Sequence, residues 1–370
     1  MSAARLRASV FVVTLAALSL AGCSSPIESF NGATASMSKM MSGPTGSVRI
    51  VPILSASTRK SETSNASDGT IRYAQSVISI PPGHKSGSIE LPTYGKADPR
   101  SNFVLVSQNE MDENEFKNTL ATNISGRVGQ NRDVLVFVHG FNTSSEEARN
   151  RLAQVMTDGH FGGVGVIFTW PSKGALLAYE SDKEHATASR DALEQTLADI
   201  AATPGVGRVH VLAHSMGTWL AMEALRQHAI AGHVGLDGHL GEVMLAAPDI
   251  DIDVFRQQMA RVGKTAKVSV FASAGDRALG ISSKIAGDRL RLGALDVKDE
   301  AVRSEIEKLG VQIYDISADA TGFIHHDTFA EAPAVVAVIG QKIGSTTDVQ
   351  QQATLDYAPP IPVDTSSPNR

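Results

Sequence analysis

Apolar residues in the middle of the chain form short continuous runs that alternate with longer segments of helical periodicity. Most of these runs lack apolar/polar alternation, so they predict strands that are covered on both faces. The runs span residues 134–138, 164–170, 209–212, 243–247, 268–272 and 311–316. Helical patterns lie between them, for example over 186–200 and 216–228. Strands and helices that alternate in this way predict a mainly parallel sheet with helices on both faces.

Shorter apolar segments precede this block and are joined by short turns. They span residues 48–54, 73–80, 88–91 and 103–106, and Pro81-Pro82-Gly83 marks one turn. Short connections between strands are typical of antiparallel pairing. We therefore expect an antiparallel extension at the start of the same sheet.

The first 22 residues have the pattern of a bacterial lipoprotein signal peptide. Two arginines precede an apolar run from Ala8 to Leu20, which is too short to span a bilayer. Small residues then lead to Cys23, as in a lipobox, so Cys23 is the expected site of lipid attachment. Such an anchor holds a protein to a membrane without a transmembrane helix. We expect export to the bacterial cell envelope, and Ser24 favours the outer membrane if the cell is Gram-negative.

The two ends of the chain differ in composition from its middle. Residues 23–46 are small, polar and without period, which predicts a flexible tether, whereas residues 344–370 predict a disordered tail. One folded domain is expected over 47–343. The net charge is −6 and the mature region contains no densely basic stretch, so a nucleic-acid partner is not expected. Cys23 is the single cysteine, so an internal disulfide is excluded.

The segment Ala213-His214-Ser215-Met216-Gly217 carries the strongest chemical signal. It follows a predicted strand, precedes a predicted helix and fits the pattern G-x-S-x-G with alanine in the first position. This pattern places a serine on a sharp strand-to-helix turn with its hydroxyl exposed as a nucleophile, and the close backbone on both sides requires small residues. We therefore predict that Ser215 is a nucleophile. His214 is expected to point away from the site and to have a packing role.

Two backbone amides are candidates for an oxyanion hole. The N–H of Met216 follows the serine at a helix start, where unpaired donors and the helix dipole favour negative charge. The buried strand 134–138 ends in His139-Gly140, and Phe141 follows where the second donor of such sites is placed. An ordinary strand-to-helix turn at this point is also compatible with the sequence.

An acid and a base are expected after the serine in chain order. Asp276 follows the strand 268–272 and is the favoured acid, with Asp249 as the alternative. His325 and His326 are the last histidines of the chain, and His326 is the favoured general base. No residue spacing indicates a metal site. His228, His233 and His239 lie in a glycine-containing connection, where solvated loop residues are expected.

These motifs resemble a bacterial family of α/β-hydrolases of uncharacterised function that are similar to esterases and lipases. The likeness spans most of residues 48–340. Its motifs are Ser57-Thr58-Arg59, Ile78-Ser79-Ile80-Pro81-Pro82-Gly83-His84, Phe137-Val138-His139-Gly140-Phe141-Asn142, Thr169-Trp170-Pro171-Ser172, Tyr179, Ser189-Arg190-Asp191, Ala213–Gly217, Ala247-Pro248-Asp249-Ile250-Asp251, Asp276-Arg277-Ala278-Leu279, and His326 followed by Phe329. The resemblance implies the α/β-hydrolase fold and catalytic roles for Ser215, Asp276 and His326.

Together these features predict a serine hydrolase that cleaves carboxylic esters through a Ser-His-Asp triad and an acyl-enzyme, without a cofactor. The partner expected is a small-molecule ester or lipid substrate; the oligomeric state is not indicated. The same triad could instead serve a thioesterase, amidase or acyltransferase, or the fold could be a non-catalytic envelope scaffold. Residues 248–267 leave little room for a lid domain, so we expect an open site, with partial cover from 171–185 and 279–308.

Overall fold

The computed structural model describes residues 46–173, 178–263, 266–320 and 325–344. Cys23 and the predicted signal peptide lie outside these residues. So do the predicted tether and tail, except for residues 46 and 344. Among the helices described, none has the length and apolar character needed to cross a membrane.

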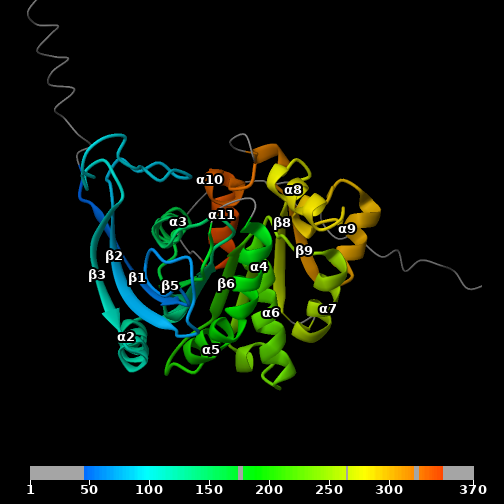
Figure 1. The fold of residues 1–370 in the computed structure, drawn as a ribbon. Helices are drawn as coiled ribbons and strands as arrows, with labels where there is room; N and C mark the ends of the chain where they lie inside the picture. Colours follow the sequence, from blue (N-terminus) through cyan, green and yellow to red (C-terminus); the bar gives the residue numbers. More distant parts are fainter. Residues whose placement is uncertain (1–45, 174–177, 264–265, 321–324, 345–370) are drawn as a thin grey trace, which may run out of the picture. The chain divides into compact units, whose positions relative to one another are not determined.

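One nine-stranded sheet organises the described residues, with the order β3-β2-β1-β5-β4-β6-β7-β8-β9. Its strands are β1 (Arg49–Ser57), β2 (Arg72–Ile80), β3 (Val104–Met111), β4 (Val134–Val138), β5 (Val164–Thr169), β6 (Val209–His214), β7 (Leu240–Ala246), β8 (Lys267–Ala272) and β9 (Val311–Asp315). Strands β1 to β3 pair antiparallel, and β1 joins the parallel strands through β5. Figure 1 shows the antiparallel strands, in blue and cyan, at one side of the sheet. The predicted mixed sheet is confirmed.

Helices cover both faces of this sheet, as expected. They are α2 (Glu113–Ser125), α3 (Ser145–Asp158), α4 (Tyr179–Ala188), α5 (Arg190–Ala201), α6 (Met216–Ile230), α7 (Ile252–Val262), α8 (Arg277–Ile285), α9 (Glu300–Glu307), α10 (Thr328–Glu331) and α11 (Pro333–Lys342). One hydrophobic core contains residues of α2, α5, α6, α7 and α9, and the other contains residues of α3, α10 and α11. In the described residues between β7 and β8 there is the helix α7 and no large lid domain.

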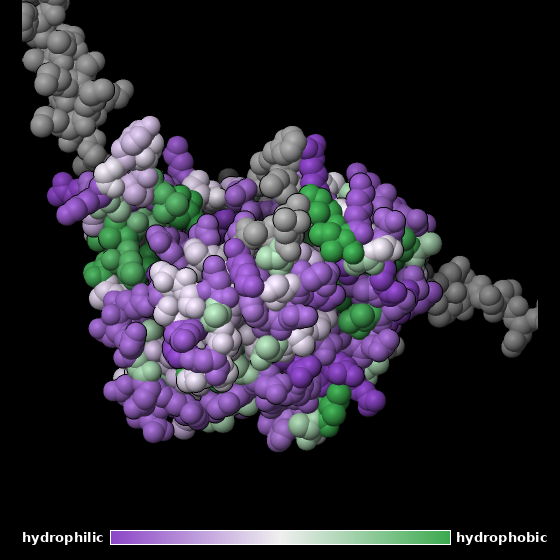
Figure 2. Space-filling model, viewed as in Figure 1, coloured by the Kyte–Doolittle hydropathy of each residue, from purple (hydrophilic) through white to green (hydrophobic). Residues whose placement is uncertain are grey.

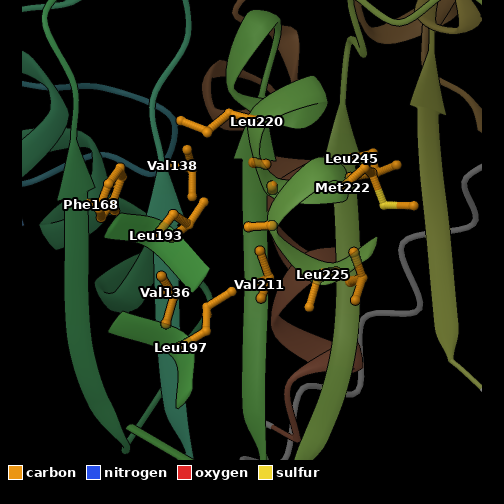
Figure 3. Packing of buried hydrophobic residues seen from close by; sticks show 14 of the residues in the cluster. Val136, Val138, Phe168, Leu193, Leu197, Val211, Leu220, Met222, Leu225 and Leu245 are labelled. Carbon is orange, nitrogen blue, oxygen red and sulfur yellow. The ribbon is translucent and has the colours of Figure 1, made fainter. Parts of the chain in front are cut away.

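The first core packs against the central strands, which carry the predicted nucleophile. Figure 3 shows Val136 and Val138 of β4 beside Leu193 and Leu197 of α5, with Val211 on the neighbouring strand β6. All five are at most 1% exposed. Burial of each such side chain contributes about 1.5–3 kcal/mol. In contrast, the face in Figure 2 is mainly hydrophilic, with its apolar side chains in small separate patches.

Two local predictions are wrong. Residues 88–91 do not form a strand; the amide of Phe103 donates to Glu90 O, but no strand ladder is assigned there. The predicted helix 186–200 is divided at Ser189, where α4 ends and α5 begins. The Ser189 hydroxyl lies 2.8 Å from both the His185 carbonyl oxygen and the Thr58 hydroxyl oxygen. Such a contact between distant segments is not visible in local periodicity.

The two sides of α6 allow a test of the core. Leu220 is fully buried and Ile230 is 55% exposed. We expect Leu220→Ala to lower the free energy of unfolding by about 2–5 kcal/mol, because it leaves a cavity. Ile230→Ala is the matched control and should change it by less than about 0.5 kcal/mol. Urea unfolding followed by circular dichroism measures both; equal effects would contradict the packing described.

Candidate active site

Ser215 occupies a sharp turn between β6 and α6. Its backbone has φ 52° and ψ −124°, a conformation that costs a non-glycine residue about 1–3 kcal/mol. Surrounding hydrogen bonds hold this conformation: the Ser215 amide donates to Ala246 O at 2.9 Å, and the Ser215 carbonyl accepts from Thr218 Oγ1 at 2.6 Å. The residue is 4% exposed and contributes to the wall of a cavity. The turn has the geometry that the G-x-S-x-G pattern predicts.

Two glycines permit the close approach of backbone at this turn. A Cβ at Gly217 would lie 2.3 Å from the carbonyl oxygen of His139. A Cβ at Gly140 would lie 2.8 Å from Cβ of Ser215. Real Cβ atoms are not found at such distances, so the loop after β4 can touch the turn only because both residues are glycine.

His326 and Asp276 are brought together although 50 positions separate them in the chain. The Nδ1 atom of His326 lies 2.7 Å from Oδ2 of Asp276, and the other oxygen of Asp276 accepts from the Leu279 amide at 3.0 Å. Burial lowers the pKa of His326, but the hydrogen bond and charge of Asp276 outweigh burial, so the pKa is raised. His326 and Ser215 line the same cavity.

The alternative residues lie in different surroundings. The imidazole of His325 lies next to Gly275, and its backbone has φ 61°. Asp249 borders the cavity, but its carboxylate accepts hydrogen bonds from Tyr179 at 2.7 Å and Ser282 at 2.5 Å and lies 3.2 Å from Arg291. The geometry therefore pairs His326 with Asp276 rather than with Asp249.

His139 fixes the loop after β4 from within. Its ring stacks on Trp170 with centroids 5.1 Å apart, and its Nε2 accepts from the Trp170 amide. Burial, with the nearby positive charge of Arg59, lowers the pKa of His139 to about 3, so the ring is neutral. Since Nε2 is an acceptor, Nδ1 carries the proton and donates to Gly140 O at 2.8 Å. In a trans peptide the C=O and N–H point in opposite directions, so this bond orients the N–H of Phe141.

Further buried polar groups hold the same loop from outside. The Arg59 guanidinium donates to Thr143 O at 2.7 Å, and the Asn142 amide donates to the Ser172 hydroxyl oxygen at 2.8 Å. Ser172 in turn donates to Asp182, which is fully buried. No sequence motif includes Asp182. Arg59 and Ser172 belong to two separate motifs, and local pattern does not show that both contact the loop after β4.

The two predicted oxyanion donors are available for a ligand. Within the described part of the chain, the amides of Phe141 and Met216 donate no hydrogen bond. In contrast, the Asn142 amide donates to Ser172 and the Thr218 amide donates to Ser215 O. Unpaired amides at a helix start favour negative charge. The structure therefore places two unused donors on the segments that meet at Ser215.

His214 does not point away from the site, so that part of its prediction is wrong, whereas the expected packing role agrees with the structure. Its Nε2 lies 3.1 Å from the carbonyl oxygen of His326, and its ring packs on His326 and Phe329 with centroids 4.7 and 4.6 Å away. Burial and then the charge of His326 lower the pKa of His214 to about 4. A neutral His214 that donates to this carbonyl supports the backbone of the loop that carries His326.

The cavity around Ser215 has a volume of about 760 Å³. Its apolar lining includes Phe141, Leu279, Ile281 and Ile285. The first residue of α4 and most of α8 contribute to its wall. Another part contains charged groups, among them Arg151 and Glu331.

The loop 84–91 forms a further part of the wall. His84 bridges Glu90 and Asp158 with both ring nitrogens at 2.8 Å, and the Gly87 amide donates to Asp158. Burial lowers the pKa of His84, but these carboxylates outweigh it and raise the pKa. The bridge ties the loop to α3, so that Ile89 and Leu91 border the cavity.

A mixed sheet with this order, helices on both faces and a serine at the turn after a central strand define the α/β-hydrolase fold. A family model described as "Alpha/beta hydrolase of unknown function (DUF900)" matches residues 112–342. The chain therefore belongs to this family.

Similarity to individual proteins is lower. The chain is 37% identical over 62 residues to an uncharacterized protein of Nostoc sp., a match that covers 17% of this chain and 16% of that protein. Among solved structures, a Pyrobaculum calidifontis esterase is 12% identical with a TM-score of 0.38, covering 85% of this chain and 91% of its own. A predicted CIB-like hydrolase from Thermoplasma acidophilum is 13% identical with a TM-score of 0.35, covering 58% and 87%.

The close approach at Gly217 predicts a steric effect. Gly217→Ala should lower the free energy of unfolding by about 1–3 kcal/mol, because the new methyl group forces the backbone of His139 to move. Gly280→Ala in α8 is the matched control: no atom lies within 4 Å of its Cβ, and alanine should be neutral or stabilise the helix by up to about 1 kcal/mol. Thermal and urea unfolding measure both. An unaffected Gly217→Ala variant would show that the turn and the loop are not in contact.

Proposed function

We propose that this protein is a serine hydrolase that cleaves carboxylic esters, with Ser215 as nucleophile, His326 as general base and Asp276 as the acid that orients it. The observation that carries the proposal is the 2.7 Å hydrogen bond between His326 and buried Asp276 beside a cavity that Ser215 also lines. Membership of an α/β-hydrolase family supports hydrolase chemistry in general.

Acyl transfer starts with the proton of Ser215. Asp276 keeps the proton of His326 on Nδ1, which leaves the Nε2 lone pair free to accept the Ser215 proton as Oγ attacks the substrate carbonyl. The C=O electron pair moves to oxygen, and the amides of Phe141 and Met216 stabilise this oxyanion. The intermediate collapses, the alkoxide leaves with the proton from His326, and Ser215 carries the acyl group.

Deacylation repeats these steps with water. His326 accepts a proton from water as the water oxygen attacks the acyl carbonyl, and the second intermediate collapses with return of this proton to Ser215. The carboxylic acid is released. Asp276 stabilises the imidazolium in both halves of the cycle, in keeping with the raised pKa of His326.

The walls of the cavity favour an ester with an apolar acyl part. Phe141 and Leu279 offer apolar surface near Ser215, whereas Ile281 and Ile285 of α8 are 45% and 41% exposed. Those exposures describe a site open toward solvent rather than a closed tunnel. We propose that accessible or short-acyl esters fit this opening better than long-chain lipids.

Replacement of the nucleophile tests the proposal directly. Ser215→Ala should abolish labelling by a fluorophosphonate probe and lower kcat on p-nitrophenyl esters by about 10⁴–10⁶-fold, while the circular dichroism spectrum stays unchanged. Ser101→Ala, at an exposed turn, is the matched control and should keep both properties.

Two results would contradict the assignment. Near-normal hydrolysis by the Ser215→Ala variant would exclude this serine as nucleophile, and failure of the wild-type protein to react with the probe or any ester would exclude catalysis by it. Faster turnover of matched thioesters than of esters would assign the same residues to a different bond.

The pH dependence of kcat/KM tests the acid–base pair. His326 must be neutral to accept a proton, so activity rises with pH through its pKa, which Asp276 raises above 6.5. Asp276→Asn removes the strongest interactions that raise this pKa while burial still lowers it, so the rising limb should move to lower pH and kcat should fall about 10⁴-fold. Asp249→Asn is the comparison and should move the limb much less. A larger shift from Asp249→Asn would reverse the choice of acid.

A further inference from the structure

A tight turn at the end of α6 brings two histidines together. The amide of His233 donates to His228 O, and that of Gly232 donates to Ala229 O, both at 3.1 Å. Gly232 has φ 101°, which its lack of a side chain permits. These bonds form a Schellman-type helix end that folds the chain back on itself. The rings of His228 and His233 consequently lie 5.0 Å apart between centroids.

Asp237 adds a carboxylate to this pair. One nitrogen from each imidazole and one oxygen of Asp237 all lie within 4.8 Å of one another. Both oxygens of Asp237 are 3.1 Å from Nδ1 of His233. The side chains of His233 and Asp237 are 53% and 63% exposed, so they can rotate toward a common centre at little cost in packing.

His228 supplies an independent observation that points to a ligand. Its side chain is 7% exposed, and its Nδ1 lies 2.5 Å from the carboxylate of Glu194. A carboxylate accepts the Nδ1 proton, which leaves a lone pair on Nε2. That Nε2 is buried and has no hydrogen-bond partner among the described residues. A buried acceptor without a partner is rare in a folded protein and calls for an explanation such as an ion.

We propose that His228, His233 and Asp237 bind a divalent transition-metal ion, with Zn²⁺ as the best-suited probe. Two imidazoles and a carboxylate are common zinc ligands, and water completes a tetrahedral shell. Glu194 acts as the outer carboxylate that fixes the tautomer and the ring orientation of His228. This differs from the solvated loop expected from the sequence. His239 is not part of the site, because the ligand atoms found within 4.8 Å of one another in the described residues belong to His228, His233 and Asp237.

The location assigns the ion a structural role. Ser215 precedes the first residue of α6 and His228 lies in its last turn, so at 1.5 Å per residue about 20 Å of helix separates them. The ligands come from α6, the following turn and the short 3₁₀ helix Leu236–Gly238, which leads into β7. A bound ion would fasten the end of α6 to this connection and thus stabilise the folded state.

Zinc binding by the full chain tests this inference. After metals are removed with EDTA, the zinc affinity is measured by competition with a chromophoric chelator, and the effect of zinc on stability is measured by thermal unfolding. We expect a wild-type Kd on the order of micromolar or tighter. His233→Asn and Asp237→Asn should weaken binding at least about tenfold, and Glu194→Gln about tenfold. His160→Asn is the matched control: it removes another exposed histidine, asparagine tolerates the positive φ at this position, and the affinity should stay unchanged.

Thermal unfolding separates binding from folding. His233 and Asp237 are exposed, so both variants should unfold at the wild-type temperature without metal, and Zn²⁺ should raise this temperature more for the wild type and His160→Asn than for either variant. Equal zinc affinity in wild type, His233→Asn and Asp237→Asn would overturn the proposal, as would no binding by the wild type at about 100 micromolar Zn²⁺. Neither readout depends on esterase activity.

Discussion

The strained backbone of Ser215 is the constraint on which the rest of the site depends. A residue with φ 52° and ψ −124° keeps this conformation only where its neighbours leave no alternative. Here the neighbours are β7, the first turn of α6 and the loop after β4, which approaches closely through Gly140 and Gly217. The sheet order therefore matters for chemistry: β6 lies between β4 and β7, so the turn is held from both sides.

Buried polar groups extend this rigidity to the loops around Ser215. His139, Ser172 and Arg59 each bond to a different residue between 140 and 143, which fixes the direction of the unused Phe141 amide. His214 does the same for the backbone at His326. Such groups are costly to bury unless they are paired, and here the pairing determines where loop atoms lie. Rigid donors stabilise a developing charge without reorganisation.

The sequence predicts the strands and turns that are determined by the residues within them. The continuous apolar run 134–138 matches β4 residue for residue, and Ser215 lies on the strand-to-helix turn that its motif predicts. Contacts between distant segments explain the failures. Ser189 divides a helix through its contact with Thr58. Residues 88–91 belong to a loop that His84 and the Gly87 amide fasten to Asp158 of α3, so they do not form a strand. The position of His214 and the meeting of His228 with Asp237 likewise depend on the folded chain.

The loop that His84 ties to α3 has a consequence for how selectivity can change. This loop precedes residue 112, where the family match begins, yet Ile89 and Leu91 border the cavity. The wall of the pocket thus combines the reactive turn with a loop fastened by one imidazole and two carboxylates. Mutation in this loop can reshape the entrance while the turn keeps its geometry.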